Sequence, residues 1–131
     1  MGIRLNLTVL PYQLGICRLE PDQALPAWAL QRPFYHISRT LDELSIICET
    51  QIIPGDVKCE PGWRAIKLEG PFDFSLIGIM LSAAAPLAEA GISILSISTF
   101  DTDYILVKEA HIAGAIKALA GAGHVVRTLN A

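Results

Sequence analysis

The sequence predicts an α+β fold made of two ferredoxin-like βαββαβ units in tandem, with antiparallel sheets that carry their helices on one face. The first observation is an internal repeat, because residues 4–49 match residues 64–109 at an offset of 60 with seven identities in 46 positions. The second is the order β-α-β-β-α-(β) expected in the second half. We therefore expect a first, degenerate unit over residues 1–60 and a more complete unit over residues 61–131.

The first half begins with extended structure and has only a weak helix. A Leu- and Val-rich strand is expected over residues 3–10, Pro11 bends or ends it, and extended structure resumes over residues 13–19. A helix of at most two turns is expected over Leu25–Leu30, because Pro21 and Pro26 stand near its start. This half is therefore expected to have lost much of its first helix.

A hairpin and a linker complete the first half. Residues 34–39 and 44–49 are rich in β-forming side chains and are joined by the turn Thr40–Glu43. Residues 54–62 have the Pro- and Gly-rich composition of a linker, and they fall where the repeat places the end of the first unit.

The second half is patterned more clearly. A strand is expected over residues 63–68, followed by a helix that Asp73 or Ser75 caps. The helix is indicated by apolar residues at helical spacing, namely Leu76, Ile77, Met80, Leu81 and Leu87. Pro86 is expected to kink or restart this helix, and Gly91 to end it.

Two strands, a second helix and an edge strand are expected after Gly91. The strands cover residues 92–99 and 104–108, with a turn at Asp101–Thr102 between them. The helix covers residues 112–120, and residues 124–129 add the edge strand.

Composition narrows the class of protein. In 131 residues, 52% are apolar and 18% charged, which favours a packed core over disorder, and a net charge of −3 argues against nucleic acid as a partner. The longest apolar segment is too short and too interrupted to cross a membrane. Three cysteines without C-x-x-C spacing indicate a reduced, cytoplasmic compartment.

The segment EGPFDFSLIGIMLSAAAPLAEAGISILSISTFDTDYILVKEAHIAGAIKAL, residues 69–119, resembles an ACT domain. Together with the degenerate first copy, it is similar to free-standing tandem ACT proteins related to aspartate-kinase regulatory domains and to CASTOR-type arginine sensors. The resemblance implies a non-catalytic, allosteric sensor that binds an amino acid or a similar small metabolite. Where ACT domains often have Asp-x-Pro-Gly, this chain has Gly-Pro-Phe-Asp-Phe-Ser, so the identity of the ligand stays open.

Two segments are candidates for the ligand site. The expected helix start offers backbone N–H groups that suit a carboxylate, and its residues are Asp73, Phe74, Ser75 and Leu76. The expected turn offers two acids, a hydroxyl and an aromatic wall, from Thr99, Phe100, Asp101 and Asp103. The resemblance places Asp103 against a ligand ammonium or guanidinium, and the repeat makes Glu43 its first-half equivalent. These residues also suit ordinary helix caps and hairpin turns.

Other functions are expected to be absent or secondary. No metal spacing, phosphate loop or G-x-S-x-G motif is present, so neither a cofactor nor a metal site is predicted. The nearest nucleophile–base pair is Cys48 with His36, and nothing in the sequence orients it. The alternative to a sensor is a ligand-free module that assembles through its sheet edges, as a homodimer or on a partner enzyme.

Overall fold

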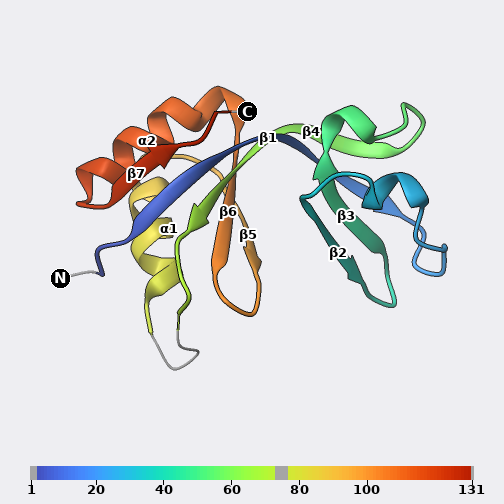
Figure 1. The fold of residues 1–131 in the computed structure, drawn as a ribbon, viewed down its shortest axis with the longest axis horizontal. Coiled ribbons are helices and arrows are strands. Elements are labelled where there is room, and N and C mark those ends of the chain that lie inside the picture. The colour runs from blue at the N-terminus through green and yellow to red at the C-terminus, as the bar shows by residue number, and fades with distance from the viewer. Residues whose placement is uncertain (1–2, 73–76, 131) are drawn as a thin grey trace. The chain divides into compact units, whose positions relative to one another are not determined.

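The computed structural model describes residues 3–72 and 77–130, and the chain divides into two compact units (Figure 1). The middle unit is Tyr12–Trp63, and the terminal unit joins Met1–Pro11 to Arg64–Ala131. Each unit has its own hydrophobic core.

Two long strands, β1 (Asn6–Leu19) and β4 (Lys58–Leu68), contribute residues to both units. The division expected at residue 60 is close to the second crossing between the units, after Trp63. The first eleven residues, however, join the C-terminal part, because β1 continues through Pro11 where the sequence suggested a bend or an end. Residues 54–62 were expected to be a linker, but residues 58–62 belong to a strand, since β4 begins at Lys58.

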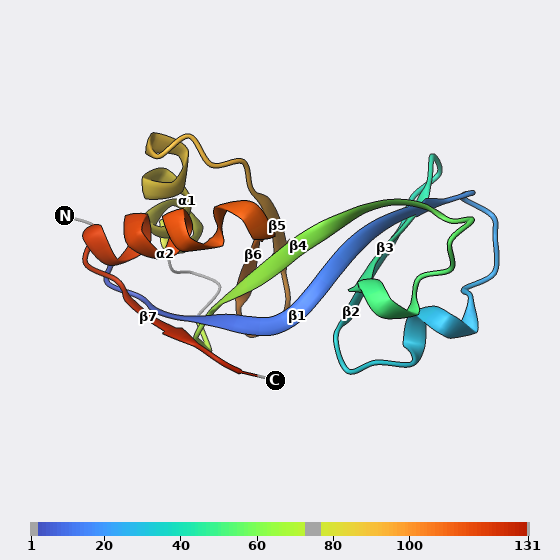
Figure 2. The same cartoon turned by 90° about the horizontal axis from the view of Figure 1, so that it is seen from above.

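The terminal unit has the β-α-β-β-α-β order expected for the second half. Its strands lie in the order β5-β6-β4-β1-β7, and the contacting helices α1 and α2 cover one face of them (Figures 1 and 2). The bounds are α1 (Ile79–Glu89), β5 (Leu95–Ser98), β6 (Asp103–Lys108), α2 (Ile112–Gly121) and β7 (Val125–Thr128).

One strand pair in this unit is parallel, although the sequence predicted antiparallel sheets. The backbone of Asn6 lies opposite Val125, and β1 and β7 run in the same direction from there. The reason is that the first part of β1 is inserted between β4 and β7. Because β1 and β4 run in opposite directions, with Asn6 beside Glu69 and Leu10 beside Arg64, β7 keeps its ferredoxin-like direction relative to β4.

Helix α1 packs through only some of the residues that the spacing indicated: Leu87 is buried and Met80 packs against the core, but Leu81 does not. Its buried residues are Ile79, Ala83 and Leu87, four residues apart, whereas Ile77 is 88% exposed and Leu81 67% exposed. The helix is apolar on most sides, so apolar spacing alone could not identify the buried face.

Helix α1 also begins later than expected. Gly78, with a φ of 84°, occupies the N-cap position, so the expectation that Asp73 or Ser75 caps this helix is wrong. At the other end, Gly91 has a φ of 75° and donates to the carbonyl of Ala88, which confirms the expected glycine stop.

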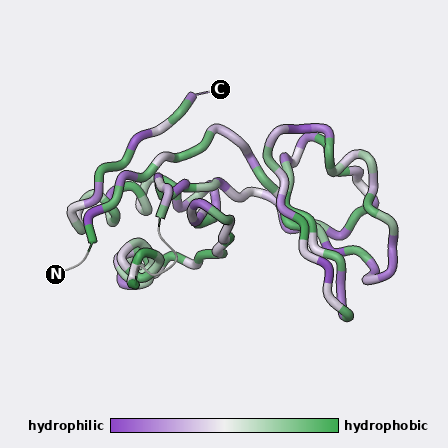
Figure 3. Tube along the Cα trace, turned by 60° about the horizontal axis from the view of Figure 1, so that its bottom comes forward, coloured by the Kyte–Doolittle hydropathy of each residue, from purple (hydrophilic) through white to green (hydrophobic). Residues whose placement is uncertain are grey.

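The middle unit repeats the same order of elements with both helices reduced. Its strands lie in the order β2-β3-β1-β4, with β2 (Tyr35–Arg39) and β3 (Leu44–Glu49) forming the expected hairpin. Single 3₁₀ turns, Ala27–Leu30 and Thr50–Ile52, stand where the helices would be, which confirms that the first helix is largely lost. Green apolar and purple polar stretches alternate along the trace of both units (Figure 3).

The two hairpins are related by an offset of 59, one less than the sequence repeat suggested. Strand β3 corresponds to β6, and the 3₁₀ turn Thr50–Ile52 corresponds to Glu109–His111, both at that offset. Buried residues follow the same register, because Ile46 and Ile105 are both fully enclosed. The gapless offset of 60 is therefore wrong by one residue in this region.

Candidate ligand site at the β5–β6 turn

The turn between β5 and β6 is held by its own threonines. The N–H of Thr99 donates to the carbonyl of Thr102 over 2.8 Å, and the Thr99 hydroxyl donates to the same oxygen over 3.0 Å. The Thr102 N–H returns a bond to the Thr99 hydroxyl over 3.3 Å. These bonds fix the backbone on either side of Phe100 and Asp101.

The segment after β4 lies directly against this turn. The N–H of Phe72 donates to the carbonyl of Asp101 over 2.9 Å, and the Thr102 hydroxyl donates to the carbonyl of Leu68. Gly70 makes this approach possible, because a Cβ at that position would lie 2.7 Å from the Asp101 carbonyl oxygen. The chain therefore enters residues 73–76 from a point fixed on the β5–β6 turn.

The predicted acids of the turn have distinct positions. Asp103 is the first residue of β6 and is partly buried, and its carboxylate accepts the Ser98 hydroxyl over 2.7 Å. Asp101 is exposed, and Phe100 is 78% exposed at the tip of the turn. The structure thus brings Thr99, Phe100, Asp101 and Asp103 together on one turn. The other four predicted residues, Asp73, Phe74, Ser75 and Leu76, lie outside the described residues.

The first-half turn has similar internal bonds but a different acid. The Thr40 N–H donates to the Glu43 carbonyl over 2.9 Å, which matches the Thr99–Thr102 bond at an offset of 59. Leu44, and not Glu43, is therefore the residue that corresponds to Asp103. The expectation that Glu43 repeats Asp103 is wrong, because the one-residue difference in offset places Glu43 opposite Thr102 in the comparison.

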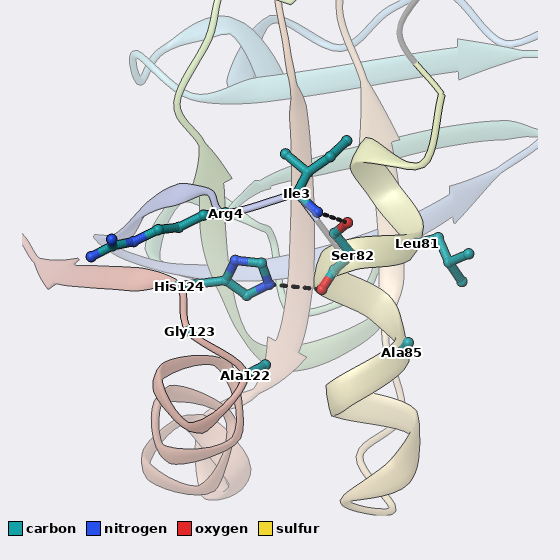
Figure 4. A pocket seen from close by; sticks show the side chains of 8 residues that line it. All are labelled: Ile3, Arg4, Leu81, Ser82, Ala85, Ala122, Gly123 and His124. Atoms are coloured by element: carbon teal, nitrogen blue, oxygen red, sulfur yellow. Dashed lines mark hydrogen bonds between the residues drawn. The ribbon is translucent and has the colours of Figure 1, made fainter. Parts of the chain in front are cut away.

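A pocket of about 690 Å³ in the terminal unit is lined in part by His124, which is not among the predicted site residues (Figure 4). His124 is 7% exposed and bridges two elements: its Nδ1 accepts the Leu5 N–H over 3.0 Å, and its Nε2 lies 2.8 Å from the Ser82 carbonyl. Since Nδ1 accepts, Nε2 carries the proton and donates. Pro86 explains the free carbonyl, because proline has no N–H to donate to the residue four positions earlier. In the sequence, the proline inside α1 is the one signal that the Ser82 carbonyl needs a hydrogen-bond donor from outside the helix.

The thiol–imidazole pair considered from the sequence is not assembled. Tyr35 pairs with Cys48 across β2 and β3, so His36 projects from the opposite face of these strands. Among residues 3–72 and 77–130, no three His, Cys, Asp or Glu side chains are grouped so that they could hold a metal ion. Within the same residues, no helix has the length and apolar character needed to cross a bilayer.

Glu69, just before the candidate site, makes stability depend on pH. The Thr8 hydroxyl donates to its carboxylate over 2.7 Å, and this bond, followed by the nearby Lys67 and Arg127 charges, lowers the pKa of Glu69. A lowered folded-state pKa stabilises the fold above the unfolded-state pKa, and the gain is lost as pH falls through the folded-state value.

We expect Thr8→Val to move the Glu69 pKa back toward its usual value. The variant should therefore have a lower free energy of unfolding than the wild type at neutral pH. This difference between the two proteins should become smaller below the pKa of Glu69. Urea unfolding of both proteins, at neutral pH and at a pH below the pKa of Glu69, measures the difference. A gap that stays constant with pH would show that the Thr8 hydroxyl does not act through the Glu69 carboxylate.

Comparisons with known proteins agree with this architecture. The family model of the ACT domain matches residues 58–121, and a second model, described as an N-terminal domain, matches residues 12–56. The first range begins with β4, and the second lies within the middle unit. The ACT match therefore covers the helices and the candidate turn of the terminal unit.

Similar proteins point the same way. A crystal structure of a protein from Agrobacterium tumefaciens is 42% identical, with a TM-score of 0.94, and the match covers 99% of this chain and 97% of that one. The "Cytosolic arginine sensor for mTORC1 subunit 1" of Mus musculus is 34% identical over 88 residues, which are 61% of this chain and 27% of the relative. This chain thus spans about a quarter of that relative's length.

A more distant likeness concerns the fold alone. The aspartate kinase of Clostridium acetobutylicum is 13% identical with a TM-score of 0.68, and the match covers 93% of this chain and 36% of that one. The βαββαβ order and the ACT-domain match to residues 58–121 lead to one conclusion. Residues 58–121 of this chain form an ACT domain.

Proposed function

We propose that this protein is a non-catalytic regulatory protein that binds a free amino acid beside the β5–β6 turn. The observation that carries the proposal is the hydrogen bond from Phe72 to Asp101, which holds the residue just before the predicted segment 73–76 against the predicted β5–β6 turn. The similarity to a protein named as an arginine sensor supports an amino acid as the class of ligand. The chain's match to the ACT-domain model supports a regulatory role.

The chemistry of the turn suits the cationic part of an amino acid. One oxygen of Asp103 accepts the Ser98 hydroxyl, and a carboxylate has about four acceptor positions, so it keeps capacity for an ammonium or guanidinium group. Asp101 adds a second negative charge, and Phe100 offers an apolar wall. The Thr99 hydroxyl is engaged in the turn, so in this proposal it shapes the site. Residues 73–76, which come before α1 in the chain, remain the proposed carboxylate side.

We further propose that the chain consists of two ACT units, of which the terminal unit carries the better site. Support comes from the repeated element order and the matching hairpins. The middle unit has Leu44 in place of Asp103 and has single 3₁₀ turns in place of helices. Its turn therefore lacks the acid that the proposed site needs. The receiver of the signal would be a second copy or a partner enzyme in the cytoplasm.

Isothermal titration against the twenty standard amino acids tests the proposal. We expect one or a few to bind, and Asp103→Asn to weaken that binding by about 10- to 100-fold, because a charge-assisted bond is lost while size and hydrogen bonding are kept. Glu43→Gln is the matched control, since Glu43 also accepts a serine hydroxyl at a hairpin turn, over 3.3 Å from Ser45.

Two outcomes would contradict the proposal. Binding that Asp103→Asn leaves unchanged would place the ligand elsewhere. If the wild type bound none of the twenty amino acids, the alternative of a ligand-free assembly module would be favoured.

A further inference from the structure

Three cysteine thiols meet within the middle unit, one from each of three neighbouring strands. Cys17 on β1 and Cys48 on β3 are 1% and 0% exposed, and Cys59 on β4 is partly exposed. The Cys17 thiol is hydrogen-bonded to both of the others, so it is the central member of the cluster. All three sulfurs are reduced in this structure.

Gly15 makes room for the outermost sulfur. A Cβ at Gly15 would lie 2.7 Å from Cys59 Sγ and 2.8 Å from the end of the Ile53 side chain. Gly15 and Cys17 face the same side of β1, because residues two apart on a strand share a face. The Cys59 sulfur therefore occupies the space over Gly15, next to the side chain of Cys17.

A small pocket leads to this pair. It encloses about 210 Å³ and is lined by both Cys17 and Cys59. Arg18 and Lys58 also line it, and so do Glu43 and Glu60, so positive and negative side chains are present in equal number. Cys48 is not among its lining residues. The pocket thus gives a small reagent access to two of the three sulfurs.

We propose that Cys59 and Cys17 form a thiol pair that a hydroperoxide oxidises to a disulfide. The Cys59 sulfur attacks the hydroperoxide, the O–O bond breaks, and Cys59 becomes a sulfenic acid while the Cys59 proton leaves with the other oxygen as an alcohol, or as water when the oxidant is hydrogen peroxide. The Cys17 sulfur then attacks the Cys59 sulfur, so that an S–S bond forms and the S–O bond breaks. The leaving hydroxide takes the Cys17 proton and departs as water. Two thiols and one hydroperoxide are consumed in total, which balances the two-electron oxidation.

The order of events follows from the surroundings of each thiol. A hydrogen bond to Cys48, followed by burial, raises the pKa of Cys17, so Cys17 is poorly suited to be the first nucleophile. Cys59 is the most exposed of the three and meets the oxidant first.

Strand register argues against Cys48 as the resolving partner of Cys17. Cys48 lies opposite Gly15 in the β1–β3 pair, so Cys17 and Cys48 are diagonal neighbours. Diagonal neighbours lie about 7–8 Å apart, with their Cβ atoms somewhat closer, whereas a disulfide needs Cβ atoms roughly 3.5–4.5 Å apart. Closure of that pair would require the backbone to move.

Peptide mapping after oxidation tests the proposal, because each cysteine lies in a separate tryptic peptide: residues 5–18, 40–58 and 59–64. The wild-type protein is treated with hydrogen peroxide, its remaining thiols are alkylated, and the digest is analysed by mass spectrometry without reduction. We expect a linked pair of peptides 5–18 and 59–64, with only Cys48 alkylated.

Two variants sharpen the result. Cys48→Ala should still form the Cys17–Cys59 link, whereas Cys59→Ser should leave Cys17 reduced at the same peroxide dose. Circular dichroism checks that both variants fold. A link between peptides 5–18 and 40–58, or three alkylated thiols in oxidised wild type, would overturn the proposal.

Discussion

Replacement of His124 by alanine should lower the free energy of unfolding by several kcal/mol. The imidazole satisfies two backbone groups, the Leu5 N–H and the Ser82 carbonyl, and each buried group left without a partner costs about 1–3 kcal/mol. The side chain is also 7% exposed, so its removal leaves a space between β7 and α1. Denaturant unfolding measures the loss.

A double-mutant cycle with Pro86 shows whether the loss of stability in His124→Ala comes from the unsatisfied Ser82 carbonyl. In a Pro86→Ala background the new N–H at position 86 can bond that carbonyl, so His124→Ala should cost less there, by at least about 0.5 kcal/mol. His111→Ala is the matched control, because His111 is exposed before α2 and should change stability by no more than about 0.5 kcal/mol. Equal costs of His124→Ala in both backgrounds would refute the link to Pro86.

Gly70→Ala should disrupt both stability and ligand binding. A Cβ there would meet the Asp101 carbonyl oxygen at 2.7 Å, the Phe72 nitrogen at 3.0 Å and the Thr102 Cβ at 3.3 Å. Most of these atoms belong to the backbone and cannot rotate away, so the segment after β4 must move off the turn. Overpacking of this kind costs about 1–3 kcal/mol. The affinity for an amino acid should fall together with the stability.

Gly121→Ala separates this effect from the general effect of adding a methyl group. Gly121 ends α2, and a Cβ there would meet nothing within 4 Å, so the substitution should be neutral or slightly stabilising. Denaturant unfolding and isothermal titration on both variants give the comparison. Full affinity in Gly70→Ala would show that contact between the turn and the segment after β4 is not needed for binding.

The hairpins were predictable because their signals are local. Alternating β-forming side chains on either side of Thr40–Glu43 and of the Thr99–Thr102 turn specify strand, turn and strand within about fifteen residues. The offset between the copies was harder to fix. Identical prolines, such as Pro11 and Pro71, align at 60, whereas the hairpins superimpose at 59, and sequence identity alone cannot locate a one-residue difference.

The packing of α1 was not predictable, for a physical reason. Apolar residues surround this helix, so the pattern included Leu81, which is exposed, and left out Ala83, which is buried against the core. The bond from His124 to Ser82 joins segments 42 positions apart, and no periodic pattern reports such a contact. Only the missing N–H of Pro86 indicated that a carbonyl in this helix needed another donor.

The passage of β1 through Pro11 was also hidden from the sequence. Proline is usually confined to strand edges and ends, which favoured a break at that position. The structure shows an unbroken strand whose first part pairs with β7, a partner more than a hundred residues away. Pairing over such a separation leaves no local signal, so the grouping of residues 1–11 with the C-terminal part could not be inferred.

In the proposed function, an amino acid binds where the segment after β4 meets the β5–β6 turn. Amide chemical shifts of the ¹⁵N-labelled protein, followed during titration with the amino acid that binds in calorimetry, test it most directly. We predict that the shifts of Gly70, Phe72 and residues 99–103 move with ligand, while those of the first-half turn Thr40–Glu43 stay in place. Shifts confined to that first-half turn, or to the pocket around His124, would contradict the claim.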